Sequence, residues 1–331
     1  MTLPYRRNRN FKTLANTCIS LQYYLYTELL TRGVVLMEDW QFGRIRFLRG
    51  ENGGKYPYNH SLYIQGDNLR VVLDPACSLA KLTRLKEEGV DQVWLSHWHE
   101  DHIHYINEFE GCTVWISKRD FPPLTDLNIF MDWYGLLAPD QRAYWEKVML
   151  EVFDFRPRQA ACFIEDDQFI DLGGLSVQVI ATPGHTPGHL SFYFPQEDLL
   201  FLGDYDLTSF GPWYGDVASS IEDTIRSIQR LKSIPARRWI VAHNTGLYEE
   251  NPGILWNLYE SVIYERESKL LAALKKPKTL EEICSCWIIY GKPRQPKEFF
   301  EFNEKIMIGK HLEYAMRQGR IVCENGLYRR V

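Results

Sequence analysis

The chain has 331 residues, of which 45% are hydrophobic and 14% aromatic, enough for a sizeable core and too much for a disordered protein. This length predicts one large domain with a smaller one. The formal net charge of −5 argues against a general nucleic-acid binder, whose surface is usually basic. The seven cysteines, an odd number without framework spacing, fit a reduced cytoplasmic setting better than a disulfide scaffold.

Residues 1–36 are expected to form an N-terminal extension outside the catalytic region. Four basic residues precede a partly apolar stretch at residues 14–30, which loosely imitates a signal peptide. Polar residues interrupt the stretch, no small-residue cleavage site follows it, and it is too short to span a bilayer. We therefore expect no membrane association.

From residue 37 the chain is predicted to consist of strands followed by mixed strands and helices. Alternating or apolar runs predict strands at residues 43–49, 61–65, 69–74, 93–95, 175–180, 190–194 and 199–202. Leucines at helical spacing predict a helix at residues 78–88 that ends at Gly89. The aromatic-rich segment 121–160 is expected to be mostly helical.

Two of the predicted hairpins resemble each other. One begins at His60 and ends at Asp74, and the other begins at His189 and ends at Asp204. Two such halves, each with flanking helices, would bury their sheets face to face and leave the helices outside. The repetition favours an α+β fold with a four-layer αββα sandwich.

The strongest chemical signal is the run His-Trp-His-Glu-Asp-His at residues 97–102, directly after a predicted strand. In extended backbone, residues two apart point the same way, so His97 and His99 can bind one ion from one side. If a helix follows, Asp101 and His102 can face a second ion. Imidazole suits zinc and iron, and a carboxylate supplies a hard oxygen ligand.

Four ligands from one loop do not fill two metal sites, so further ligands are expected later in the chain. His185 lies in a turn rich in proline and glycine, Asp204 follows a predicted strand, and His243 follows an apolar run at residues 239–242. Ligands on loops at the ends of strands suit a preorganised site.

This order of ligands resembles that of the metallo-β-lactamase superfamily, and the resemblance covers residues 37–262. It implies that the first metal is held by His97, His99 and His185. It implies that the second is held by Asp101, His102 and His243, with Asp204 bridging the two. The expected cofactors are two divalent metal ions, zinc first, with iron or manganese as alternatives. One departure is Asn244 after His243, where many members have glycine.

The implied activity is hydrolysis. A hydroxide shared by two cations is a strong nucleophile near neutral pH, and Asp101 would orient it and accept its proton. The expected substrate is a small molecule with an ester, thioester or lactone carbonyl, and the turn at residues 184–189 resembles that of the glyoxalase II-like thioester hydrolases. The aromatic residues after Asp204 are interpreted either as walls of a substrate pocket or as core residues: Tyr205, Trp213 and Tyr214.

Residues 263–331 are expected to form a linker helix and a small winged-helix-like domain. Helices are predicted at residues 251–274 and 301–318, a capping box at Thr279, and a final hairpin on an Asn-Gly turn. Such a domain raises an alternative function, a metal-dependent nuclease (phosphodiesterase) that binds RNA or DNA. From residue 276 onward there are 11 Lys/Arg against 7 Asp/Glu, without a dense basic run. This favours packing over the active-site face or homodimer formation.

A third alternative is an iron-dependent persulfide dioxygenase with one metal ion, which shares much of the ligand pattern. His102 and His243 beside Asp204 favour two metals. The remaining histidines of this region are interpreted as structural, with His189 supporting the ligands and His104 exposed beside them.

Overall fold

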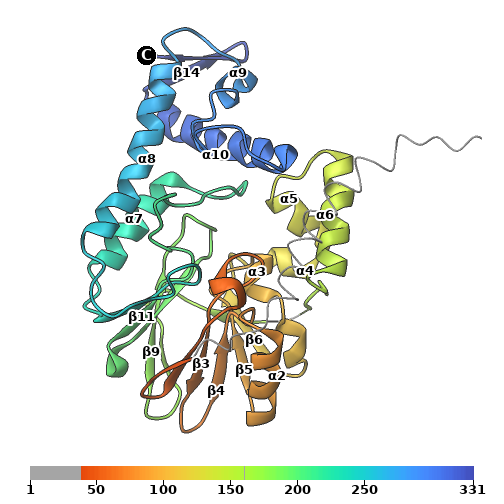
Figure 1. The fold of residues 1–331 in the computed structure, drawn as a ribbon, viewed down its shortest axis with the longest axis vertical. Helices are drawn as coiled ribbons and strands as arrows, with labels where there is room; N and C mark the ends of the chain where they lie inside the picture. The colour runs from red at the N-terminus through yellow and green to blue at the C-terminus, as the bar shows by residue number, and fades with distance from the viewer. Residues whose placement is uncertain (1–38, 160) are drawn as a thin grey trace, which may run out of the picture.

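The computed structural model describes residues 39–159 and 161–331. The predicted N-terminal extension at residues 1–36 lies outside these residues. Two mixed sheets form the centre of the structure (Figure 1). The first sheet has the order β1 (Trp40–Phe42), β2 (Ile45–Leu48), β3 (Ser61–Gln65), β4 (Arg70–Leu73), β5 (Gln92–Trp94), β6 (Thr113–Ser117) and β7 (Cys162–Ile164). The second has the order β13 (Leu247–Tyr248), β12 (Arg238–Ile240), β11 (Leu199–Phe201), β10 (Leu190–Phe194), β9 (Ser176–Ala181) and β8 (Phe169–Asp171).

Side chains alternate between two buried faces in these sheets. On β3, Leu62 and Ile64 belong to the apolar cluster between the sheets, and Tyr63 belongs to the cluster on the outer face. A strand that is buried on both sides must alternate in this way, because successive side chains point to opposite faces. The β3–β4 and β10–β11 hairpins predicted from their shared pattern are both present.

Helices cover the outer face of each sheet, so the predicted αββα layering is observed. The first sheet is covered by α2 (Leu79–Glu88) and α4 (Pro122–Thr125). The buried apolar residues of α5 (Leu127–Trp133) and α6 (Pro139–Glu151), which lie beyond the end of this sheet, belong to the same cluster. The second is covered by α7 (Ile221–Lys232) and α8 (Ile254–Ala273). The short α3 (Glu100–Ile103) follows β5 at one edge of the sandwich.

The C-terminal region contains α9 (Leu280–Cys284), α10 (Lys297–Arg317) and the hairpin β14 (Ile321–Glu324) and β15 (Leu327–Arg330). The predicted order of helices and hairpin is therefore present, and the capping box at Thr279 is confirmed. The apolar residues of this region belong to the same cluster as Trp239 of β12 and Trp256 of α8. The predicted boundary after residue 262 falls inside α8, so α8 joins the C-terminal elements to the catalytic region through a shared core.

Helix α10 extends from α8 toward α5 and α6 (Figure 1). A Cβ placed on Gly135, which follows α5, would lie 3.2 Å from Cδ1 of Ile306 in α10. The C-terminal region therefore contacts both halves of the sandwich. Among the helices that the structure describes, none is long and apolar enough to cross a bilayer.

Candidate metal centre

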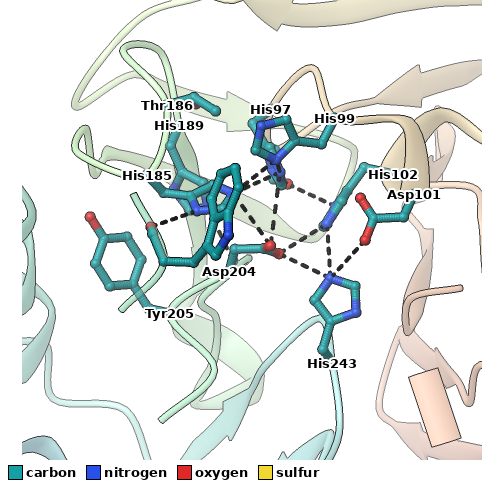
Figure 2. Close-up of polar contacts among 12 residues, drawn as sticks. His97, His99, Asp101, His102, His185, Thr186, His189, Asp204, Tyr205 and His243 are labelled. Carbon is teal, nitrogen blue, oxygen red and sulfur yellow. Dashed lines mark hydrogen bonds and ion pairs between the residues drawn. The ribbon is translucent and has the colours of Figure 1, made fainter. Parts of the chain in front are cut away.

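The seven predicted ligands converge at one edge of the sandwich (Figure 2). His97 and His99 follow β5, and α3 carries Asp101 and His102. The other three occupy the β9–β10 turn and the segments after β11 and β12: His185, Asp204 and His243. Strands β11 and β12 are parallel, so their carboxyl ends meet at the same edge. The distant segments are therefore brought together by the sheets.

A glycine permits the close approach of Asp204 to the other ligands. Gly203 has φ +61°, and a Cβ at this position would lie 2.5 Å from Nε2 of His189. That nitrogen accepts a hydrogen bond from the backbone N–H of Asp204 at 3.1 Å. A side chain at residue 203 would displace the imidazole that fixes the backbone of Asp204.

The first cluster has the dimensions of a tetrahedral metal site. The Nε2 atom of His97 lies 3.0 Å from Nδ1 of His99 and 3.2 Å from Nε2 of His185, and the last two atoms are 3.0 Å apart. Oδ2 of Asp204 completes the set, 3.4 Å from His185 and 4.0 Å from His97. Ligands about 2.0 Å from a tetrahedral zinc ion are about 3.3 Å from one another. The donors therefore fit a single cation.

Hydrogen bonds on the far side of each ring leave a lone pair directed at this centre. Nδ1 of His185 contacts the carbonyl oxygen of Trp213 at 3.1 Å, and a carbonyl can only accept, so Nδ1 carries the proton. Nε2 of His99 donates to Oδ2 of Asp216 at 3.0 Å. Nδ1 of His97 donates to Oγ of Ser96, which itself donates to Asp74. Lone pairs of three imidazoles facing one another would repel, and a cation between them removes that repulsion.

In the second cluster too, one ring nitrogen of each histidine donates to a fixed acceptor and the other faces the centre. Nδ1 of His243 donates to Gly54 O at 2.6 Å, and Nδ1 of His102 donates to Oδ2 of Asp74 at 2.9 Å. Their Nε2 atoms, 3.3 Å apart, lie 3.4 Å and 2.9 Å from Oδ1 of Asp204. Oδ2 of Asp101 lies 3.5 Å from Nε2 of His243. The two oxygens of Asp204 therefore face different clusters, as expected for a bridging ligand.

The pKa values of the histidines differ between the clusters. Burial lowers the pKa of His99 and His185 to about 4, and it holds the pKa of His97 well below its usual value, so all three are neutral near pH 7. Burial also lowers the pKa of His243, but the charge and hydrogen bond of Asp204 outweigh it and raise the value to about 9. Without a cation, a proton occupies this position, so protons compete with metal for the second cluster.

Two aspartates that orient the ligands were not predicted as part of the site. Asp74 also accepts from the backbone N–H of Ser96 at 2.7 Å and has φ +51°, which Asp tolerates better than most residues. Asp74 ends a hairpin that resembles the hairpin ending at Asp204, so the sequence could have indicated that Asp74 belongs to the site. Asp216 is fully buried, and no pattern in the sequence indicated its role. Carboxylates behind ligand histidines fix the tautomer and the ring orientation.

Two supporting histidines were interpreted from the sequence. His189 supports the ligands as predicted, since it accepts from Asp204 N and its Nδ1 contacts Oγ1 of Thr182 at 2.8 Å. The prediction that His104 is exposed was wrong. It is buried, and its two ring nitrogens contact the carbonyls of Pro57 and Val152.

A cavity of about 390 Å³ opens beside the metal ligands. It is lined by Asp204, Asp206, Thr208, Ser209, Phe210, Gly211, Trp213 and Asn244. Of the predicted pocket residues, only Trp213 lines it. Tyr205 and Tyr214 are buried in the core, which agrees with the other of the two interpretations, as core residues. The hydroxyl of Tyr205 donates to Pro183 O at 3.0 Å, and Figure 2 shows its ring apart from the ligand cluster.

Comparison with known proteins identifies the family of this chain. The sequence model of the metallo-beta-lactamase superfamily matches residues 57–243, more than half of the chain. The chain belongs to this superfamily. It is 28% identical over 200 residues to a probable polyketide biosynthesis zinc-dependent hydrolase of Bacillus subtilis (strain 168), covering 59% of this chain and 75% of that protein. It is 24% identical over 220 residues to a hydroxyacylglutathione hydrolase of Hyphomonas neptunium (strain ATCC 15444), covering 65% and 69%.

Solved structures of this superfamily share the fold. A metallo-beta-lactamase family protein from Thermus thermophilus has a TM-score of 0.65 and 24% identity, covering 87% of this chain and 99% of that one. A beta-lactamase domain protein from Burkholderia ambifaria has a TM-score of 0.64 and 15% identity, covering 91% and 96%. Both alignments extend well beyond the 57–243 match, so the likeness in fold includes much of the C-terminal region.

Proposed function

We propose that this superfamily member is a hydrolase that holds two divalent cations, zinc first among them, and cleaves an ester, thioester or lactone of a small molecule. One observation carries the proposal. In each histidine of the two clusters one ring nitrogen donates to a fixed acceptor, and the other ring nitrogen faces the remaining ligand atoms of its cluster, with one oxygen of Asp204 at each cluster. Lone pairs of nitrogen and oxygen that face one another repel, and bound cations would remove this repulsion.

Each ligand has a distinct task in this proposal. His97, His99 and His185 would hold the first cation, His102, His243 and Asp101 would hold the second, and Asp204 would contribute to both sites. Bound cations of this kind lower the pKa of water and polarise a carbonyl oxygen. Asp101 lies at the rim of the second cluster, where its carboxylate can accept the proton that the attacking water loses.

The cavity wall favours a neutral reacting group. Phe210 and Trp213 supply aromatic surface, Thr208 and Asn244 supply polar groups, and Asp206 supplies a carboxylate. Within the described cavity wall there is no lysine or arginine to pair with a phosphate or a free carboxylate. An uncharged acyl group therefore fits this cavity better than a phosphodiester. Similarity to the hydroxyacylglutathione hydrolase and to an atrochrysone carboxyl ACP thioesterase, 23% identical, supports a thioester in particular.

The runner-up function is a nuclease. We propose that α9, α10 and the β14–β15 hairpin form the predicted winged-helix-like element. Exposed Lys292 and Arg294 lie in the loop before α10, and exposed Lys297 is the first residue of α10. Packing of α8 and α10 against the catalytic region supports a structural role for this element instead, because its apolar residues share the core of the second sheet.

Metal analysis and a substrate panel test the proposal. Freshly purified full-length protein should contain about two zinc, iron or manganese ions per chain and hydrolyse thioesters or lactones faster than bis(4-nitrophenyl) phosphate. Binding of RNA that weakens steeply as salt rises, together with preferred phosphodiester cleavage, would establish the nuclease instead. One iron per chain with oxygen uptake on a persulfide would establish the dioxygenase.

A further inference from the structure

The segment between β11 and α7 connects the cavity to the first metal cluster. We call residues 208–219 the wall loop, because several of them line the cavity. The carbonyl of Trp213 accepts a hydrogen bond from Nδ1–H of His185, and Asp216 accepts one from Nε2–H of His99. Oγ of Ser219 also donates to the backbone carbonyl of His185 at 2.7 Å. The position of the wall loop therefore sets the direction of the lone pairs of two ligands.

Arg266 of α8 holds this loop in place. Its guanidinium group donates to Phe210 O at 2.6 Å, to Pro212 O at 3.0 Å and to the hydroxyl of Tyr214 at 2.9 Å. It also lies 4.5 Å from the centre of the Phe210 ring, and only 2% of its surface is exposed. A planar group with five N–H donors can satisfy several acceptors at once, and the wall loop has no helix or strand to do so.

Helix α10 holds the loop from the other side. The hydroxyl of Tyr214 lies 2.8 Å from Nε2 of His311, and the ammonium of Lys310 donates to Val217 O. The contacts from α8 and α10 flank the two groups that reach the metal ligands, Trp213 O and Asp216. All three contributing side chains come after residue 243, where the superfamily match ends. The C-terminal region therefore reaches the metal centre through the wall loop.

We propose that Arg266 is a positioning residue for the first metal cluster. By holding the wall loop, it keeps Trp213 O and Asp216 where they fix the tautomer and the direction of His185 and His99. The inference rests on the proposed function, because it requires that these histidines bind a metal ion. A lysine at residue 266 would keep the charge, but a single ammonium group cannot reach the two carbonyls and the hydroxyl together.

Zinc affinity separates positioning from simple structural support. The variants are Arg266→Gln and Arg266→Lys in the full chain, with Arg320→Gln as the matched control. Arg320 pairs with Glu267, the next residue of α8, and its side chain also contacts Gln318 and the ring of Tyr314, which lie outside the wall loop. For each protein we would measure zinc binding by competition with a chromophoric chelator, the visible spectrum of the cobalt(II) form, and thermal unfolding of the metal-free chain.

Arg266→Gln should weaken zinc binding at one site by about 10-fold, the lower end of the effect of losing a group that contacts a ligand directly, because Arg266 acts through the wall loop. It should also shift the cobalt spectrum. Arg266→Lys should show a smaller loss. Arg320→Gln should keep wild-type affinity, even where its melting temperature falls as much. Equal loss of affinity in both glutamine variants, or none in Arg266→Gln, would overturn the proposal.

A milder variant covers the case in which Arg266→Gln does not fold. Tyr214→Phe keeps the buried ring and removes one of the three acceptors of Arg266. It should weaken zinc binding by a few-fold, and wild-type affinity there would overturn the proposal. Absence of zinc binding by the wild-type chain would instead overturn the proposed function, and this inference with it.

Discussion

Replacing Asp74 by Asn should disable the second metal cluster while leaving the backbone intact. The carboxylate accepts from the backbone N–H of Ser96, from the Ser96 hydroxyl and from Nδ1 of His102. An amide has one oxygen, so it cannot accept from both sides. Because the backbone N–H of Ser96 can only donate, the amide oxygen of Asn should face it and the NH₂ group should face His102.

His102 would then accept at Nδ1 and carry its proton on Nε2, where the metal lone pair is needed. Restoring the metal-binding tautomer against this preference should cost about 1.4–2.8 kcal/mol, which corresponds to a 10–100-fold loss of zinc affinity at the second cluster. The metal-free chain should lose roughly 1.5–3 kcal/mol of unfolding free energy, because a hydrogen bond to a charged group is lost. Asn tolerates the φ of +51° at this position, which Ala would not.

Zinc titration against a chelator, with urea unfolding of the metal-free chain, measures both effects. The matched control is Asp91→Asn, at the opposite end of the same strand pair, where the carboxylate accepts from the backbone N–H and the guanidinium group of Arg70 and from none of the predicted ligands. This control should bind zinc as the wild type does. If Asp74→Asn also keeps wild-type affinity at both clusters, the tautomer reasoning is wrong.

Three further outcomes follow from the same geometry. Asp204→Ala removes an oxygen from both clusters, so zinc content should fall from two toward one ion per chain and hydrolysis should drop at least about 100-fold, measured by metal analysis and initial rates. Chelation of the metal should lower the melting temperature, since a site filled at a thousand times its dissociation constant stabilises the folded state by about 4 kcal/mol, and an unchanged melting curve would contradict metal binding. His311 is fully buried, and burial lowers its pKa from 6.5 to about 3. Below about pH 6.5, His311 is protonated in the unfolded chain and neutral in the folded chain. The free energy of unfolding therefore decreases as pH falls from about 6.5 toward 3. In the metal-free protein, His311→Gln should reduce this loss by about 1.4 kcal/mol per pH unit, measured by urea unfolding between about pH 7 and pH 5.

The predicted ligands of both clusters could be found in the sequence because their positions depend on local features, namely residue spacing and the ends of strands. His97 and His99 are two apart after a strand, and Asp204 and His243 follow apolar runs that become the parallel strands β11 and β12. Periodicity and strand ends are properties of short segments, so the sequence alone indicated them. The sandwich was predicted from the resemblance between the two hairpins.

The tertiary structure decided which groups stand behind those ligands and which aromatic residues face the substrate. Asp216 lies in a loop without a repeating pattern, and it reaches His99 only because α8 and α10 hold that loop. Tyr205 and Trp213 both follow Asp204 in aromatic segments, yet one packs in the core and the other lines the cavity. The difference depends on packing partners distant in the chain, and neither composition nor spacing contains that information.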